Sequence, residues 1–204
     1  MDTRIGFGWD SHAFKAGVPL RIGAMTLEHP EGLAGHSDGD VLLHAITDAL
    51  LGSVAAGDIG SYFPPGDPRW KDADSAIFLK VALEELHHAG FRIVNVDTTL
   101  VLAAPKIGPI AGEMRARVAE LLGVELDQVS IKAKTPEGLN LDHVAQCHAV
   151  ALVERVTDAD ELKSMSAVIE SQKQLEDVVD DLLASVHGVP KKRPAPVYDT
   201  EDIT

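Results

Sequence analysis

Two polar residues near the start of the chain have a spacing that would let them bind a common ligand. The stretch GWDSHAF, residues 8–14, places Asp10 and His12 two positions apart among apolar neighbours. Residues two apart in a strand project from one face, so both side chains could meet a common ion. Taken alone, the pair fits a structural role better, with His12 bonded to a backbone carbonyl and Asp10 in solvent. A metal site is therefore one of two interpretations.

Two further histidines make the metal-site interpretation stronger. In GHSDGDVLLHAITDA, residues 35–49, His36 comes just before a predicted helix and His44 lies inside it. A histidine on an apolar helical face is usually a packing residue. Imidazole and carboxylate groups, however, suit Zn²⁺, and three protein ligands with an open fourth position are typical of a catalytic zinc site. Asp10, His12 and His44 would supply that set.

Strands and helices alternate along the rest of the first three quarters of the chain. The predicted strands cover 3–14, 19–27, 91–103, 129–135 and 147–156, and the predicted helices cover 38–56, 75–88 and a segment from Gly108 or Pro109 to Gly123. We expect 3–14 and 19–27 to pair as a hairpin, and Ser37 or Asp38 to cap the first helix. The Gly- and Pro-rich segment 58–74 reads as a long loop. Together these features predict an α/β fold with a single mixed sheet and a helical layer.

Composition excludes several classes of partner. The formal net charge of −14 argues against binding a nucleic-acid backbone, although an acidic protein can bind phosphate through divalent cations, helix N-termini and backbone N–H groups. The single cysteine, Cys147, cannot form an internal disulfide, which fits a reducing, cytoplasmic setting. Neither a targeting segment nor an apolar run of membrane-spanning length is evident, so we expect no membrane partner.

The last quarter of the chain differs in character. We expect one domain over 1–156 and an acidic extension over 157–204. In the extension, apolar residues at alternating spacings of three and four predict a helix over about 160–187, either docked on its own subunit or joining subunits as a coiled coil. The final residues, PKKRPAPVYDTEDIT, are typical of a disordered tail.

Four stretches carry a family resemblance. GWDSHAF, GHSDGDVLLHAITDALLGSVAAGDIGSYFP, APK at 104–106 and IKAKTPEGL at 131–139 resemble the 2-C-methyl-D-erythritol 2,4-cyclodiphosphate synthases of the non-mevalonate isoprenoid pathway, over about residues 3–155. The resemblance implies a homotrimer with active sites between subunits. It also implies a phosphorus-oxygen lyase. The 2-phosphate of 4-diphosphocytidyl-2-C-methyl-D-erythritol 2-phosphate attacks the β-phosphate, which yields the cyclic diphosphate and CMP.

The resemblance also implies roles for individual residues. Asp10, His12 and His44 match the ligands of zinc or another divalent transition metal, and Glu137 helps to hold Mg²⁺ or Mn²⁺. His36 and Thr135 match the catalytic pair, although Thr135 alone would read as an ordinary strand residue. The implied substrate-binding set is Asp10, His12, His36, Ser37, Asp58, Ile59, Gly60, Phe63, Asp67, Leu102, Ala103, Ala104, Pro105, Lys106, Ile107, Gly108, Lys134, Thr135, Pro136, Glu137 and Leu141.

The chain departs from the family pattern in two places. KAKTPEGLN has Lys134 where a threonine is common, together with Pro136 and Asn140. The segment LDHVAQCHAV is shorter than its family counterpart and lacks the Arg and Glu that line the trimer's central cavity, which argues against isoprenoid diphosphate binding there. Two alternatives stay open from the residues alone: a zinc-dependent phosphohydrolase with water as nucleophile, and a non-catalytic trimeric scaffold organised by the acidic extension.

Overall fold

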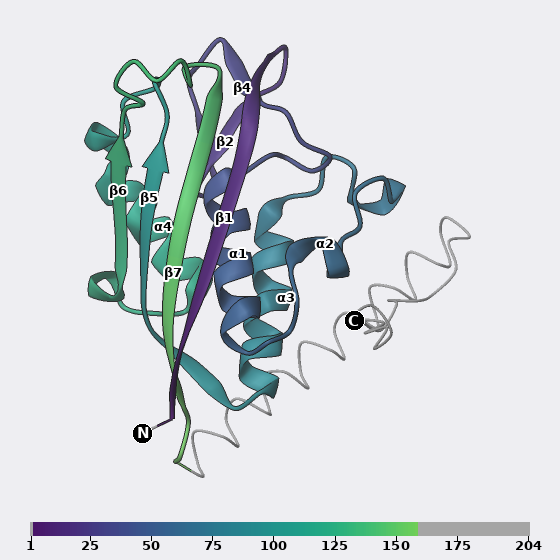
Figure 1. Cartoon of the computed structure of the whole chain (residues 1–204), viewed down its shortest axis with the longest axis vertical. Helices are drawn as coiled ribbons and strands as arrows, with labels where there is room; N and C mark the ends of the chain where they lie inside the picture. Colours follow the sequence, from purple (N-terminus) through teal and green to yellow (C-terminus); the bar gives the residue numbers. More distant parts are fainter. Residues whose placement is uncertain (1, 159–204) are drawn as a thin grey trace. The chain divides into compact units, whose positions relative to one another are not determined.

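The computed structural model describes residues 2–158 (Figure 1). Every described helix and strand belongs to one compact unit, Met1–Val156. The helix predicted over 160–187 and the tail after it lie outside the described residues. Within 2–158, no helix has the length and apolar character required to cross a bilayer.

A five-stranded mixed sheet forms one layer of this unit, in the order β4-β1-β7-β5-β6 (Figure 1). The long N-terminal strand β1 runs antiparallel to β7 from Thr3 to Ala13, and β5 is antiparallel to β7 but parallel to β6. The strands are β1 Thr3–Ala16, β4 Glu31–Leu33, β5 Phe91–Val101, β6 Val129–Lys134 and β7 Val144–Arg155. The predicted single mixed sheet is therefore confirmed.

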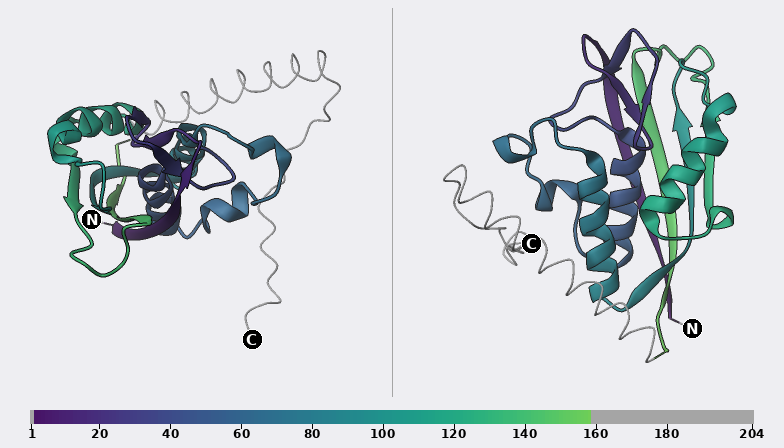
Figure 2. Two further views of the ribbon diagram at one scale, coloured as in Figure 1. Left: turned by 90° about the horizontal axis from the view of Figure 1, so that it is seen from above. Right: turned by 180° about the vertical axis from the view of Figure 1, so that it is seen from behind.

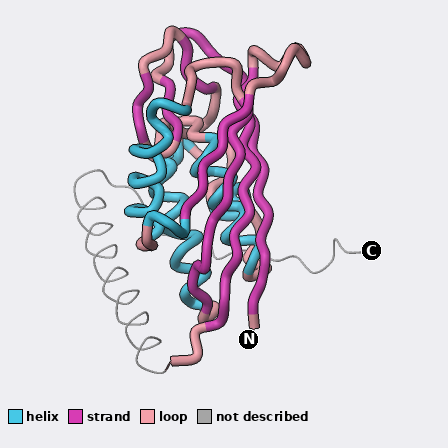
Figure 3. Tube along the Cα trace, turned by 90° about the vertical axis from the view of Figure 1, so that its left-hand side faces the viewer, coloured by secondary structure: helices cyan, strands magenta, loops and turns pink. Residues whose placement is uncertain are grey.

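Within residues 2–158, helices cover one face of the sheet, as the rear and edge-on views show (Figures 2 and 3). The three main helices are α1 Val41–Ser53, α3 Ser75–His88 and α4 Ala111–Leu122, with short turns η2 Gly108–Ile110 and η3 Leu126–Gln128 around the last. Buried side chains such as Leu50, Leu79 and Met114 fill the space between helices and sheet. The opposite face of β1 is bare: Ile5, Phe7 and Trp9 are 70%, 61% and 49% exposed.

The predicted pairing of 19–27 with the first strand was wrong. That segment folds on itself as β2 Leu20–Ile22 and β3 Met25–Leu27, while β4 pairs with β1. The physical reason is the turn between them: Gly23 and Ala24 both have positive φ, at 67° and 56°. Two such residues form the tight turn that favours a hairpin between the strands on either side of it.

The predicted N-cap of the first helix was also wrong, by two or three residues. Helix α1 begins at Val41 and is capped by Asp40, whose side chain accepts from the N–H groups of Leu42 and Leu43. The same buried carboxylate accepts from the backbone N–H groups of Gly23 and Ala24, at 2.9 and 2.7 Å. Asp40 therefore fixes the β2-β3 turn against the start of α1, which the chain pattern alone does not show.

The predicted loop 58–74 contains local structure. Asp58 caps the short helix α2 Ile59–Tyr62, and Asp67 caps the 3₁₀ helix η1 Pro68–Trp70. Aspartates at these positions accept the N–H groups that a helix start leaves unpaired, which explains why an Asp-rich segment adopts such turns. Asp74 then caps α3, which begins at Ser75 as predicted.

Candidate active site

Strand β1 and helix α1 approach each other unusually closely. A Cβ added at Gly6 would lie 1.7 Å from the Ala49 carbonyl oxygen, and one added at Gly8 would lie 1.9 Å from that of Ala45. Only glycine permits this approach, because any side chain would occupy the helix backbone. Side chains alternate along a strand, so Asp10, next but one after Gly8, faces the same helix.

The close approach brings three predicted ligands together. Asp10 Oδ2 lies 2.9 Å from His12 Nε2 and 3.0 Å from His44 Nδ1, and the two ring nitrogens are 3.1 Å apart. Figure 1 shows β1 and α1, which supply these residues, running side by side. The side chains of Asp10, His12 and His44 are 25%, 17% and 10% exposed. The sequence prediction that these three could share an ion is thus met geometrically.

The triangle fits a small divalent metal ion. Zinc binds imidazole nitrogen and carboxylate oxygen at about 2.0–2.1 Å, which places neighbouring tetrahedral ligands about 3.3 Å apart. The three edges here are within about 0.4 Å of that spacing. An ion in this position would contact one oxygen and two nitrogens, which suits zinc or a similar transition metal. A fourth position would remain for a substrate oxygen.

Asp10 and His12 shift each other's pKa. Burial alone would raise the pKa of Asp10, but its hydrogen bonds to His12 and His44 hold that pKa well below its usual range. Burial would lower the pKa of His12, yet the Asp10 carboxylate raises it, aided by the Ala34 backbone. Because Asp10 favours the protonated form of His12, a proton on His12 and a bound cation would compete for the cluster.

Ser37 contacts this cluster, and His36 precedes Ser37 in the chain. Ser37 Oγ is 3.3 Å from His44 Nε2. His36 Nε2 donates to the Asp67 carbonyl at 2.7 Å, and the His36 carbonyl accepts from the backbone N–H of Asp72. The predicted phosphate contacts are therefore tied to the segment 58–74.

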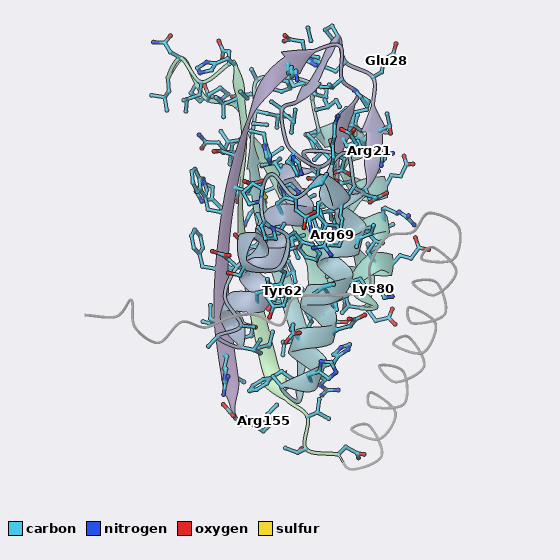
Figure 4. All side chains as sticks on the ribbon, turned by 90° about the vertical axis from the view of Figure 1, so that its right-hand side faces the viewer. Arg21, Glu28, Tyr62, Arg69, Lys80 and Arg155 are labelled. Carbon is cyan, nitrogen blue, oxygen red and sulfur yellow. The ribbon has the colours of Figure 1, made fainter. Side chains whose placement is uncertain are left out.

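That segment is held in place from two sides. Asp48 of α1 accepts from the N–H of Ile59 at 2.8 Å, which anchors the start of α2. Farther along, the rings of Phe63, Trp70 and Phe78 pack together, with the Phe63 and Phe78 centroids 4.3 Å apart. Figure 4 labels Tyr62 and Arg69 on this segment. The predicted site residue Phe63 thus has a packing role toward α3.

The two predicted acids of the segment are engaged in capping. Asp58 accepts from both the backbone N–H and the hydroxyl of Ser61 at 2.8 Å. Asp67 forms an ion pair with Arg69 at 2.6 Å, and the Arg69 guanidinium lowers the pKa of Asp67. Both side chains therefore act as hydrogen-bond acceptors, and Asp58 keeps acceptor capacity for hydroxyl groups.

A pocket of about 380 Å³ lies at the other edge of the sheet. It gathers most of the residues that the resemblance assigns to the cytidine and diphosphate: the lining includes Leu102, Pro105, Lys106, Ile107, Gly108, Lys134, Thr135 and Glu137. Ala111, Ile131 and Ala133 complete it. The predicted residues Ala103, Ala104, Pro136 and Leu141 are not among the lining residues.

The pocket and the Asp10 cluster are separate within one chain. The pocket lies along β6, and three strand spacings separate β6 from β1, which is about 14 Å. In the pocket, the Thr135 hydroxyl donates to the Glu137 carboxylate, and Glu137 adopts a positive φ of 48°. The structure therefore does not bring Glu137 to the three predicted metal ligands in the same chain.

Sequence reasoning missed several residues that shape the site. Asp38 was considered only as a helix cap and Ser75 only as a helix start, and Asp40 was not considered. Ser75 Oγ lies 2.8 Å from His44 Nε2. One signal was available in the sequence: Gly6 and Gly8 share the alternation of Asp10 and His12, which indicates a close backbone approach on that face.

Comparison with known proteins is consistent with this geometry. The model of the YgbB family matches residues 3–154, which include every described site residue. The chain belongs to the YgbB family. A relative from Koribacter versatilis, named 2-C-methyl-D-erythritol 2,4-cyclodiphosphate synthase, is 60% identical over 152 residues, which cover 74% of this chain and 98% of the relative. A relative of the same name from Moorella thermoacetica is 52% identical over 136 residues, covering 67% and 83%.

Solved structures of the YgbB family share the fold. A 2C-methyl-D-erythritol-2,4-cyclodiphosphate synthase superposes with a TM-score of 0.70 at 39% identity, over 74% of this chain and all of that one. A CDP-bound form of such a synthase gives the same TM-score at 37% identity and the same coverage. The family resemblance stated from the motifs is thus confirmed.

Proposed function

We propose that this chain converts 4-diphosphocytidyl-2-C-methyl-D-erythritol 2-phosphate into 2-C-methyl-D-erythritol 2,4-cyclodiphosphate, with release of CMP. The observation that carries the proposal is the triangle of Asp10, His12 and His44, with edges of 2.9 to 3.1 Å, in a member of the YgbB family. The reaction makes the enzyme a phosphorus-oxygen lyase. Its place is in the supply of isoprenoid and terpenoid precursors.

The chemistry requires two phosphates to approach each other, so catalysis consists mainly of positioning and charge neutralisation. Zinc or a similar ion, held by Asp10, His12 and His44, would polarise the β-phosphate when bound. The Glu137 carboxylate, already an acceptor for Thr135, would help to hold Mg²⁺ or Mn²⁺, which is commonly bound by one or two carboxylates and substrate phosphates.

The protein's own groups orient the substrate. His36 uses Nε2 to donate to the Asp67 carbonyl, so Nδ1 is the ring nitrogen that this bond does not use. Asp58 offers carboxylate oxygens to the methylerythritol hydroxyls. Lys106 and Lys134 in the pocket supply positive charge near the diphosphate, and the backbone from Leu102 to Gly108 reads the cytosine edge. Lys106 and Lys134 are the only basic residues among the described residues that line the pocket.

A homotrimer explains how the two halves of the site meet. In one chain the cytidine pocket lies along the edge strand β6, whereas the metal cluster lies on β1 and α1, so a neighbouring chain would bring its pocket to the cluster. The bare face of β1 and β7, with Ile5, Phe7, Trp9 and Val150 exposed, gives an apolar surface that a second copy would cover. Thr135 would then donate to phosphate in the neighbour's site.

Further assignments follow from the same proposal. Residues 1–156 would form the synthase domain and 157–204 an extension whose role is independent of the chemistry. The buried Cys147, whose pKa burial raises, carries no reactive role and fits a cytoplasmic enzyme. The shortened segment near 140–147, which lacks the family's Arg and Glu, argues against isoprenoid diphosphate binding in the central cavity.

The test is a product assay with the purified full chain. With the diphosphocytidyl substrate, Zn²⁺ and Mg²⁺, we expect equimolar CMP and cyclic diphosphate, identified by phosphorus NMR and mass spectrometry. CMP together with a linear phosphate product would instead favour a phosphohydrolase. The variant His44→Ala should abolish turnover, and Glu137→Gln should lower it while leaving bound zinc unchanged. No turnover in the metal-loaded wild type would overturn the proposal.

A further inference from the structure

The second ring nitrogen of His44 enters a buried polar network. Ser75, the first residue of α3, is fully buried, and its Oγ lies 2.8 Å from His44 Nε2. The opposite nitrogen, Nδ1, faces Asp10 at 3.0 Å. Which nitrogen carries a proton therefore decides whether His44 presents a lone pair or an N–H group to the Asp10 cluster.

Asp38 fixes the direction of the Ser75 hydroxyl. Among the described residues, the partners of the Asp38 side chain offer hydrogens: the backbone N–H groups of Asp40 and Ser75, both at 3.2 Å, and the Arg21 guanidinium at 3.9 Å. Asp38 is therefore an acceptor, and the Ser75 hydroxyl, which also lies within bonding distance of it, donates to it. Figure 4 labels Arg21 on this side of the molecule.

A serine hydroxyl has one hydrogen to give. Once that hydrogen is directed to Asp38, Ser75 Oγ can only accept from His44, so the proton of His44 belongs on Nε2. Nδ1, the atom that faces Asp10 and His12, is then the nitrogen that would give up its hydrogen bond to Asp10 and bind a cation. Ser37 Oγ is farther from the same nitrogen, at 3.3 Å, so Ser75 is the preferred acceptor and the Ser37 hydroxyl stays available for a ligand.

We propose that Asp38 and Ser75 form a bridge that sets the tautomer of His44 and so prepares its Nδ1 to bind a transition-metal ion. This inference rests on the proposed function, because it assumes that the cluster holds the catalytic metal. Ser75 and Asp38 are positioning residues, since neither touches the reacting atoms. Partners of this kind typically contribute 10- to 100-fold to metal affinity, because they fix both the orientation and the basicity of the ligand.

The bridge also joins the metal cluster to another part of the fold. Asp38 lies between β4 and α1, Ser75 opens α3, and His44 lies on α1. Their bonds hold the start of α3 against the first turn of α1 next to the ligand set. Arg21 extends the network to the β2-β3 hairpin and to Asp74, at 3.4 Å. Weakening the bridge should therefore change metal affinity through His44 alone, since neither Asp10 nor His12 forms a hydrogen bond to Ser75 or Asp38.

The experiment measures Zn²⁺ affinity of the full chain by competition with a chromophoric chelator, without substrate. Ser75→Ala should weaken binding about 10- to 100-fold. Asp38→Asn should weaken it about 10-fold, because the asparagine amide can donate to Ser75 and so allow Ser75 to donate to His44 Nε2, which favours the wrong tautomer. If both act through one bridge, the double variant should bind within about threefold of Ser75→Ala.

The matched control is Ser53→Ala, which removes another buried hydroxyl from the same helix as His44. Ser53 donates to the Leu50 carbonyl and has no bond to the ligand set, so zinc affinity should equal that of wild type. Thermal unfolding checks that each variant is folded. Should Ser75→Ala fail to fold, the isosteric Asp38→Asn alone carries the comparison.

Two results would overturn the bridge: a folded Ser75→Ala protein whose zinc affinity is within threefold of wild type, or Asp38→Asn with wild-type affinity. Failure of the proposed function looks different. Tight zinc binding by wild type, with the predicted losses in both variants but no CMP release, would refute the synthase assignment and leave the bridge intact. Absence of zinc binding in wild type would refute the metal site and the bridge with it.

Discussion

Replacing Gly8 by alanine tests whether backbone contact between β1 and α1 builds the metal cluster. The added Cβ would lie 1.9 Å from the Ala45 carbonyl oxygen and 2.7 Å from the Ala49 nitrogen. Ordinary contact begins at 3.4 Å, so strand and helix must separate by about 1.5 Å at this point. Both contacts are backbone atoms, which cannot rotate away as a side-chain end could.

The consequence for the cluster follows from its position. Ala45 is adjacent to His44, so a separation of about 1.5 Å would stretch the 3.0 Å distance from Asp10 Oδ2 to His44 Nδ1 toward about 4.5 Å. Metal sites tolerate about 0.2 Å in ligand distance. We expect at least a 100-fold loss of zinc affinity, about 2.7 kcal/mol. Overpacking should also cost about 3 kcal/mol of stability, or about 6 to 12 °C in Tm.

The assay is zinc content of dialysed protein together with chelator competition and thermal unfolding. Gly52→Ala is the matched control, because it lies on the same helix and its added Cβ would meet only the Phe7 carbonyl oxygen, at 3.9 Å. It should keep full zinc affinity and gain about 0.5 to 1 kcal/mol, since alanine favours the helix. A folded Gly8→Ala protein with wild-type zinc affinity would refute the reasoning that this contact sets the ligand spacing.

Three further outcomes follow from the site. His12→Ala and His44→Ala should each lose zinc on dialysis without unfolding the core, since both side chains lie at the edge of it; stoichiometric zinc in both variants would contradict the ligand assignment. Because Asp10 raises the pKa of His12, their pairing stabilises the metal-free fold fully below pH 6.5 and fades as pH rises through that raised pKa. Zinc should therefore raise Tm more at pH 8 than at pH 6, as scanning calorimetry can show, and an equal shift at both would contradict proton competition. Phe7→Glu on the bare face of β1 should reduce the proposed trimer to smaller species in light scattering, whereas an unchanged mass would place the interface elsewhere.

Much of the fold could be predicted because its signals are local. Alternating apolar and polar residues indicated β1, and apolar residues three or four positions apart indicated α1. Gly90 and Gly123 follow α3 and α4, the helices that they were predicted to end. The error at 19–27 arose because strand pairing is decided by turn geometry and by competition among strands. Ala24 completes that hairpin turn with a positive φ, which an alanine in the sequence does not indicate. The cap at Asp40 was missed because its partners include Gly23 and Ala24, far from α1 in the chain.

The sequence by itself determined the ligand types, the family and the alternation that places Asp10 and His12 on one face. Only the tertiary structure decided that His44 completes the triangle, since that depends on two glycines that let α1 touch β1. The tertiary structure also shows that the cluster and the pocket along β6 are apart in one chain, and that Ser75 contacts His44. The physical reason is range: residue type and period act over a few positions, whereas contacts between residues 31 to 34 positions apart exist only after the sheet and helices have packed.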